Sequence, residues 1–85
     1  MAHISSTTSS RNKEQNEMVF RVRLQQLREK KRISRRVASE LCGLSSSAFR
    51  RYERGEQEPT LHSLVAIAEF FGVSVDYLVG RRDLQ

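Results

Sequence analysis

The segment GLSSSAFRRYERGE covers residues 43–56. Within it, three arginines and two aromatic residues surround the carboxylate of Glu53. A helix over residues 46–54 would turn by about 100° per residue and sort these side chains by face. One face would be apolar, with Ala48, Phe49 and Tyr52. The opposite face would be polar and basic, with Ser47, Arg50, Arg51 and Arg54. Because like charges this close repel by a few tenths of a kcal/mol per pair, roughly, the basic face favours binding of an external polyanion.

Glu53 and two further arginines extend this interpretation. On the same helix Glu53 falls beside Phe49, at the edge of the buried face, so it needs a cation from another helix. Arg35 and Arg36 open a second predicted helix, over residues 35–42. The macrodipole disfavours cations at a helix start, and a phosphate lying over that start would reverse the preference. We therefore expect Arg35 and Arg36 to contact phosphate, against the alternative that both are merely solvated.

The charge distribution agrees with a polyanion partner on one side. The 85-residue chain has a formal net charge of +5. Eleven basic and three acidic residues lie between Arg21 and Arg54, whereas residues 61–80 hold two acidic residues and neither lysine nor arginine. A basic half and a mildly acidic half are typical of a protein that binds a polyanion with one face, although composition alone fits an ordinary solvated surface equally well.

Composition and hydrophobic spacing predict one small all-α domain of five helices. The chain is 38% hydrophobic, with four glycines and one proline, which suits short helices joined by short turns better than a sheet. The predicted helices cover residues 17–31, 35–42, 46–54, 61–71 and 75–79. Residues 1–16 are polar and are expected to form a disordered leader. The domain is therefore expected over 17–80, with a C-terminal tail over 81–85.

Helix boundaries follow from capping residues. Ser34, Ser45, Thr60 and Ser74 are the predicted N-caps, and glycines end four of the helices: Gly43, Gly55, Gly72 and Gly80. The helix over 35–42 has two adjacent apolar stripes, Val37 with Leu41 and Ala38 with Cys42. Because the bulk lies at Val37 and Leu41, a one-residue rotation of this helix stays open.

Several sequence pieces in order carry a resemblance to a known family. They are GLS at 43–45, RYERG at 51–55, EPTL at 58–61 and FGVSVDYLVG at 71–80. Together they make residues 18–80 resemble the DNA-binding domain of the lambdoid phage repressor and Cro family, which includes bacterial regulators of the xenobiotic-response-element type. The resemblance implies a compact repressor-like fold with a helix-turn-helix, in which the helix over 46–54 enters the major groove.

The same resemblance implies roles for individual residues. Base-reading positions fall on Ser46, Ser47, Arg50 and Arg51. Backbone phosphate positions fall on Arg35 and Arg54, and an ion pair joins Arg28 to Glu53. Arg51 is the preferred guanine reader, because its position matches a base-reading position of the family. A homodimer on a pseudo-palindromic site is expected, since one module contacts about one half-site.

Other chemistry finds little support in the sequence. His62 has no partner at metal-ligand spacing, and His3 lies in the expected leader. Cys42 is better explained as a small core residue than as a nucleophile. No catalytic triad or phosphate-binding loop is present, so we predict a non-enzyme without metal or cofactor. The single cysteine, and the lack of a signal peptide or membrane-spanning run in the sequence, favour the cytoplasm.

Two functions from different classes remain. The first is a sequence-specific regulator of transcription, more naturally a repressor, that binds double-stranded DNA. The second is a protein-interaction module, such as an antitoxin-like or accessory subunit, for which DNA binding is secondary. A weaker third is the targeting domain of a longer enzyme. Affinity for duplex DNA that falls steeply with salt separates the first from the second.

Overall fold

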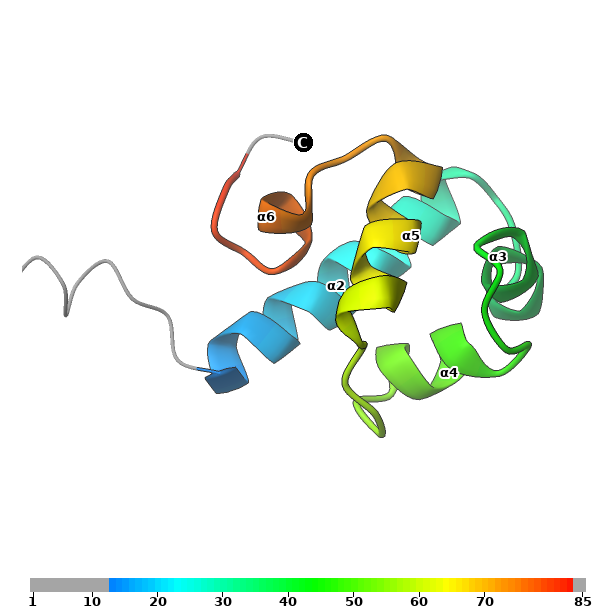
Figure 1. The fold of residues 1–85 in the computed structure, drawn as a ribbon, viewed down its shortest axis with the longest axis horizontal. Coiled ribbons are helices and arrows are strands. Elements are labelled where there is room, and N and C mark those ends of the chain that lie inside the picture. The colour runs from blue at the N-terminus through cyan, green and yellow to red at the C-terminus, as the bar shows by residue number, and fades with distance from the viewer. Residues whose placement is uncertain (1–12, 84–85) are drawn as a thin grey trace, which may run out of the picture.

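The computed structural model describes residues 13–83, and five helices lie within them (Figure 1). These are α2 (Lys13–Lys30), α3 (Arg35–Leu41), α4 (Ala48–Glu53), α5 (Leu61–Phe71) and α6 (Val75–Leu78). The described residues include no strand, so the predicted all-α fold of five helices is confirmed. α3 packs against α4, and α2 packs against both α4 and α6. The pair α3 and α4 therefore occupies one end of the domain and α6 the other (Figure 1).

The core forms where the predicted apolar faces meet. α2 contributes Phe20, Leu24 and Leu27 at helical spacing, and all three are buried. The other helices contribute the remaining large side chains: Phe49, Tyr52, Ile67 and Leu78. The ring of Phe20 meets that of Tyr52 edge-on, with centroids 5.9 Å apart, so α2 and α4 are joined at the centre of the core.

Three of the predicted N-caps are confirmed. The side chains of Ser34, Thr60 and Ser74 each accept a hydrogen bond from the backbone three residues on, which satisfies one of the free N–H groups at a helix start. Gly72 adopts a left-handed conformation after α5, with φ of 69°. The helix boundaries beyond these caps agree with the prediction to within one residue, except at the starts of α2 and α4.

The start of α2 corrects the predicted leader. The helix begins at Lys13, so residues 13–16 are helical, whereas residues 1–12 lie outside the described part of the chain. Lys13 forms an ion pair with Glu58 at 2.9 Å, which joins the first turn of α2 to the loop before α5. This contact is between residues distant in sequence, and the local polarity of residues 13–16 gave no sign of it.

The start of α4 is also later than predicted. The helix begins at Ala48, and Ser46 and Ser47 form a turn before it. Ser47 is the N-cap residue but makes no capping hydrogen bond with its side chain. The predicted cap, Ser45, accepts a hydrogen bond from Arg51 at its hydroxyl instead.

α3 is rotated so that its small residues face the core. Ala38 and Ser39 are completely buried, whereas Val37 and Leu41 are 40% and 59% exposed. Cys42 packs against the core from the end of the helix. Small side chains on the inner face let α3 lie close to α4, which a valine and a leucine there would prevent.

Candidate nucleic-acid interface

The two faces of α4 are separated as the helical spacing predicted. Ala48, Phe49 and Tyr52 are buried, whereas Arg50 and Arg54 are exposed on the other side. No side chain in the described part of the chain pairs with Arg50, which leaves its guanidinium open to an external ligand. Burial of the aromatic face thus determines which way the basic face points.

An open pocket of about 300 Å³ lies between the start of α3 and the turn before α4. Ser34, the N-cap of α3, is part of its lining. The other lining residues are five of the seven that were predicted to contact DNA: Arg35, Arg36, Ser46, Ser47 and Arg50. Three of these are arginines and none is acidic. The fold therefore brings together two basic segments that are ten or more residues apart in the sequence, with short serine side chains between the arginines.

The side chain of Arg51, the guanine reader preferred from the sequence, is engaged in hydrogen bonds with other residues of the chain. Its Nε donates to Gln57 Oε1 at 2.6 Å, and its Nη2 donates to Ser45 Oγ at 3.2 Å. A further hydrogen bond runs from Nη1 to the hydroxyl of Ser47. The guanidinium therefore connects the turn before α4 with the loop after it. Gln57 and Ser45 lie six residues from Arg51 on either side, outside helical spacing, so sequence periodicity did not reveal these contacts.

The predicted phosphate contacts, in contrast to Arg51, are only loosely held. Arg36 pairs with Glu40 at 3.2 Å, and Arg54 pairs with Glu56 at 3.0 Å. Both pairs are well exposed, and exposed pairs contribute about 0–1 kcal/mol, so a phosphate can displace either carboxylate. Arg35 has no side-chain partner among the described residues.

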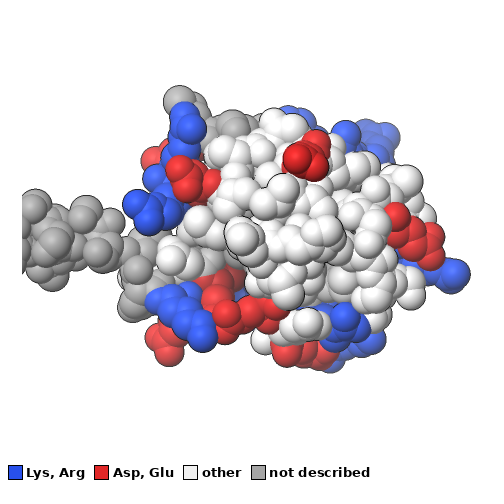
Figure 2. All heavy atoms as spheres, viewed as in Figure 1, with Lys and Arg blue, Asp and Glu red and all other residues white. Residues whose placement is uncertain are grey.

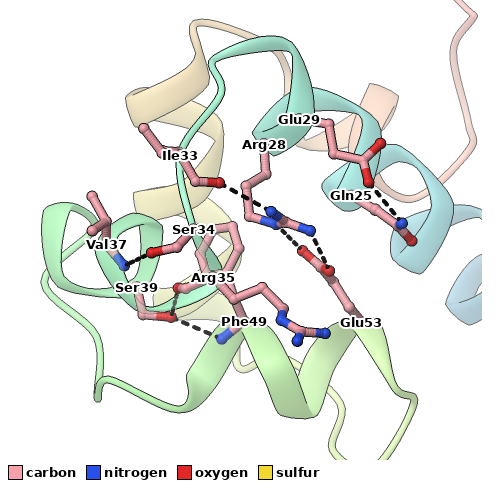
Figure 3. A network of polar contacts seen from close by, with 10 residues as sticks. All are labelled: Gln25, Arg28, Glu29, Ile33, Ser34, Arg35, Val37, Ser39, Phe49 and Glu53. Atoms are coloured by element: carbon pink, nitrogen blue, oxygen red, sulfur yellow. Dashed lines mark hydrogen bonds and ion pairs between the residues drawn. The ribbon is translucent and has the colours of Figure 1, made fainter.

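The ion pair between Arg28 and Glu53 is confirmed (Figure 3). Arg28 Nε and Nη2 donate to the two carboxylate oxygens of Glu53 at 2.7 and 3.1 Å. The side chains are 14% and 4% exposed, respectively. Arg28 Nη1 also donates to the carbonyl of Ile33 at 3.0 Å. The bond to Glu53 raises the pKa of the Arg28 guanidinium, against the opposing effect of burial. One arginine on α2 therefore orients both α4 and the connection to α3.

The face over α5 contrasts with this basic end. Figure 2 shows a largely uncharged surface there, with basic and acidic side chains together around its margin. Leu61 and Val65 are 74% and 41% exposed on α5. The surface over α5 therefore offers apolar rather than basic side chains, in keeping with the absence of lysine and arginine from residues 61–80.

Other kinds of site find no geometric support in residues 13–83. No group of three histidine, cysteine or acidic side chains there is placed to hold a metal ion. Cys42 is partly buried, and burial raises the pKa of its thiol to about 11. None of the described helices is long and apolar enough to cross a membrane.

Residues 24–78 match the sequence model of the Helix-turn-helix family. The chain belongs to this family. Its helix-turn-helix is formed by α3 and α4, and the predicted likeness to phage repressors is confirmed by a solved relative. The P22 c2 repressor, crystallised in complex with synthetic operator 9T, matches with a TM-score of 0.68 and 28% identity over 74% of this chain and 96% of that one.

Curated relatives of this helix-turn-helix chain include two from Bacillus subtilis (strain 168). The HTH-type transcriptional regulator AnsR is 37% identical over 59 residues, which are 69% of this chain and 51% of AnsR. The HTH-type transcriptional regulator YobD is 36% identical over 61 residues, 72% of this chain and 54% of YobD. The chain therefore spans about half the length of these relatives.

Proposed function

We propose that this chain is the DNA-binding part of a transcriptional regulator that recognises a specific double-stranded sequence, more naturally as a repressor. The observation that carries the proposal is the open pocket where Arg35, Arg36 and Arg50 converge between α3 and α4. A pocket with three arginines and no carboxylate suits a phosphate backbone beside a base edge. The P22 c2 repressor, whose fold this chain shares, was crystallised with an operator, which supports the same partner here.

Roles within this interface follow from how freely each side chain can move. Arg50 has no internal partner to release, so we assign it the bidentate contact to guanine O6 and N7 in the major groove. Ser46 and Ser47 pack against neighbouring bases or phosphates. Arg35, Arg36 and Arg54 bind phosphates. Arg51 remains a candidate reader, but it would first give up its bonds to Gln57 and Ser45.

The proposal extends to partners and location. One module reads about one half-site, so two copies on a pseudo-palindromic operator are expected. We also propose a cytoplasmic protein without enzymatic activity, cofactor or metal. The alternative, a protein-interaction module, draws support from the exposed apolar residues on α5, Leu61 and Val65.

Selection of bound duplexes from a random library tests the base-reading roles. The wild type should select a site with at least one guanine per half-site. Arg50→Ala should relax selection at that guanine by about 1–3 kcal/mol, with Arg51→Ala giving the smaller effect. If all three proteins select the same sequence with equal stringency, neither arginine is a reader and specificity lies in the serines or in DNA shape.

Salt dependence tests the phosphate contacts and the alternative function together. Arg35→Ala and Arg54→Ala should each lower the slope of log K against log salt by about one. Arg81→Ala is the matched control, because Arg81 is exposed beyond α6 at the other end of the domain. Unchanged slopes would remove both arginines from the interface. Negligible affinity of the wild type for any duplex would favour the protein-interaction module.

A further inference from the structure

α4 lacks a cap from its own N-terminal residues. Ser47 occupies the N-cap position, yet its side chain makes no hydrogen bond to the backbone of the first turn. The N–H of Phe49, the second residue of α4, instead donates to Ser39 Oγ at 2.9 Å. Ser39 lies ten residues earlier, on α3, so a side chain from the preceding helix takes the place of the missing cap (Figure 3).

The hydroxyl of Ser39 is also fixed on its own helix. It donates to the carbonyl of Arg35 at 2.8 Å, and Ser39 is completely buried. A hydroxyl has one proton to donate, and here that proton is used, so its oxygen is left to accept from Phe49. The backbone carbonyl of Ser39 accepts from Leu44 at 2.9 Å. One residue therefore holds the first turn of α3, the connecting turn and the start of α4 together.

The ends of this connection lie at the proposed DNA interface. Arg35, whose carbonyl accepts the hydrogen bond from Ser39 Oγ, lines the open pocket from α3. Arg50, which directly follows Phe49, lines the same pocket from α4. A shift of the Phe49 backbone relative to the Arg35 backbone would therefore change the spacing between the two arginines. A misplacement of about 1 Å is enough to spoil the geometry of a functional site.

We propose that Ser39 is a positioning residue for sequence recognition. Its hydroxyl sets the start of α4 relative to α3, and with it the aim of Arg50, although Ser39 is buried and touches no DNA. This inference rests on the proposed function. Alanine would fill the same buried site without clash and favours helix, but it would leave the Phe49 N–H without its partner.

Ser39→Ala is the test, with Ser74→Ala as the matched control. Ser74 Oγ accepts from the Tyr77 N–H at 2.9 Å, so the control removes an equivalent hydroxyl–amide bond at α6, away from α3 and α4. The first measurement is amide hydrogen exchange without DNA. Exchange at Phe49 should accelerate at least about fivefold in Ser39→Ala relative to its neighbours and stay as in wild type in Ser74→Ala. Ser39→Cys, with a weaker acceptor of similar size, should fall between.

The second measurement compares affinity for the selected duplex with affinity for a duplex altered at the Arg50-dependent guanine. Ser39→Ala should lose discrimination by about three- to tenfold, the worth of one neutral hydrogen bond, while its affinity for random duplex and its salt slope stay unchanged. Ser74→Ala should discriminate as wild type does. Discrimination retained in Ser39→Ala would overturn the proposal, whether or not Phe49 exchange changes. If wild type itself fails to discriminate, the proposed function fails, and this is seen without any variant.

Discussion

The ion pair between α2 and α4 offers the sharpest test of how this fold is held. Glu53→Gln keeps the length and shape of the side chain but removes its negative charge. Arg28 would then retain its bond to the Ile33 carbonyl and face an amide where it now has two carboxylate oxygens, at 2.7 and 3.1 Å. Because the Arg28 side chain is 14% exposed, water can replace the lost partner only in part.

The size of the effect can be worked out from this geometry. Removing one partner of a buried ion pair costs about 3–5 kcal/mol. The remaining Ile33 contact and the residual exposure of Arg28 place this pair at the lower end, about 3 kcal/mol. A domain of this size has a total stability of about 4–10 kcal/mol. Since 1 kcal/mol shifts the melting temperature of such a domain by about 4–8 °C, Glu53→Gln should melt roughly 10–25 °C below wild type.

Thermal melting followed by circular dichroism measures this shift, with Arg36→Ala as the control. Arg36 and Glu40 form an ion pair of the same type on the surface, with side chains 78% and 52% exposed. Its loss should cost below about 0.5 kcal/mol. A double substitution, Arg28→Met with Glu53→Leu, should recover part of the loss, because it removes both charges. A Glu53→Gln protein that melts within a degree or two of wild type would refute the reasoning.

Two further predictions concern the backbone and the cysteine. Gly43 has φ of +76° with open space where a Cβ would lie, so Gly43→Ala should lower the free energy of unfolding by about 1 kcal/mol. At Gly80 the new Cβ would lie 2.9 Å from Val19 Cγ1, so Gly80→Ala should lower it by about 2 kcal/mol or more. Urea denaturation measures both losses, and equal losses would contradict the contact with Val19. Burial raises the pKa of Cys42 from 9.0 to about 11, so at pH 8 its thiolate is depleted, and iodoacetamide should label the folded chain at least about tenfold more slowly than the urea-unfolded chain. Because this pKa is higher in the folded than in the unfolded chain, the unfolded thiol ionises first, and the free energy of unfolding should fall as pH rises from 9 towards 11.

Much of the fold could be predicted because it depends on local signals. Phe20, Leu24 and Leu27 repeat at helical spacing, and Ser34, Thr60 and Ser74 cap the helices that they precede. The inward position of Glu53 followed from its place beside Phe49. Its partner could not be found this way, because twenty-five residues separate it from Arg28. The resemblance to phage repressors supplied that partner.

The errors arose where contacts between distant residues outweighed local preference. Three consecutive serines precede α4, and each is an acceptable N-cap by residue type. The buried hydroxyl of Ser39 satisfies the Phe49 N–H, so none of the three is needed at the first turn, and the helix begins at Ala48. In α3, the two stripes differ in bulk rather than polarity. Close approach to α4 selects the smaller one, and this requirement is visible only once the two helices are packed.

The same contacts explain why the basic face of α4 is tolerated before any partner binds. Arg54 is partly neutralised by Glu56 at 3.0 Å. Arg51 is bound to serine and glutamine side chains, which orient its guanidinium without cancelling its charge. Arg50 has neither kind of partner in the described chain. The positive field around the pocket therefore stays strong, and of the three arginines on the basic face of α4 only Arg50 has an unrestrained guanidinium among the described residues. At the proposed interface a guanine would displace no internal partner of Arg50, whereas Arg51 would first release Gln57 and Ser45, and this is why Arg50→Ala should relax selection more than Arg51→Ala.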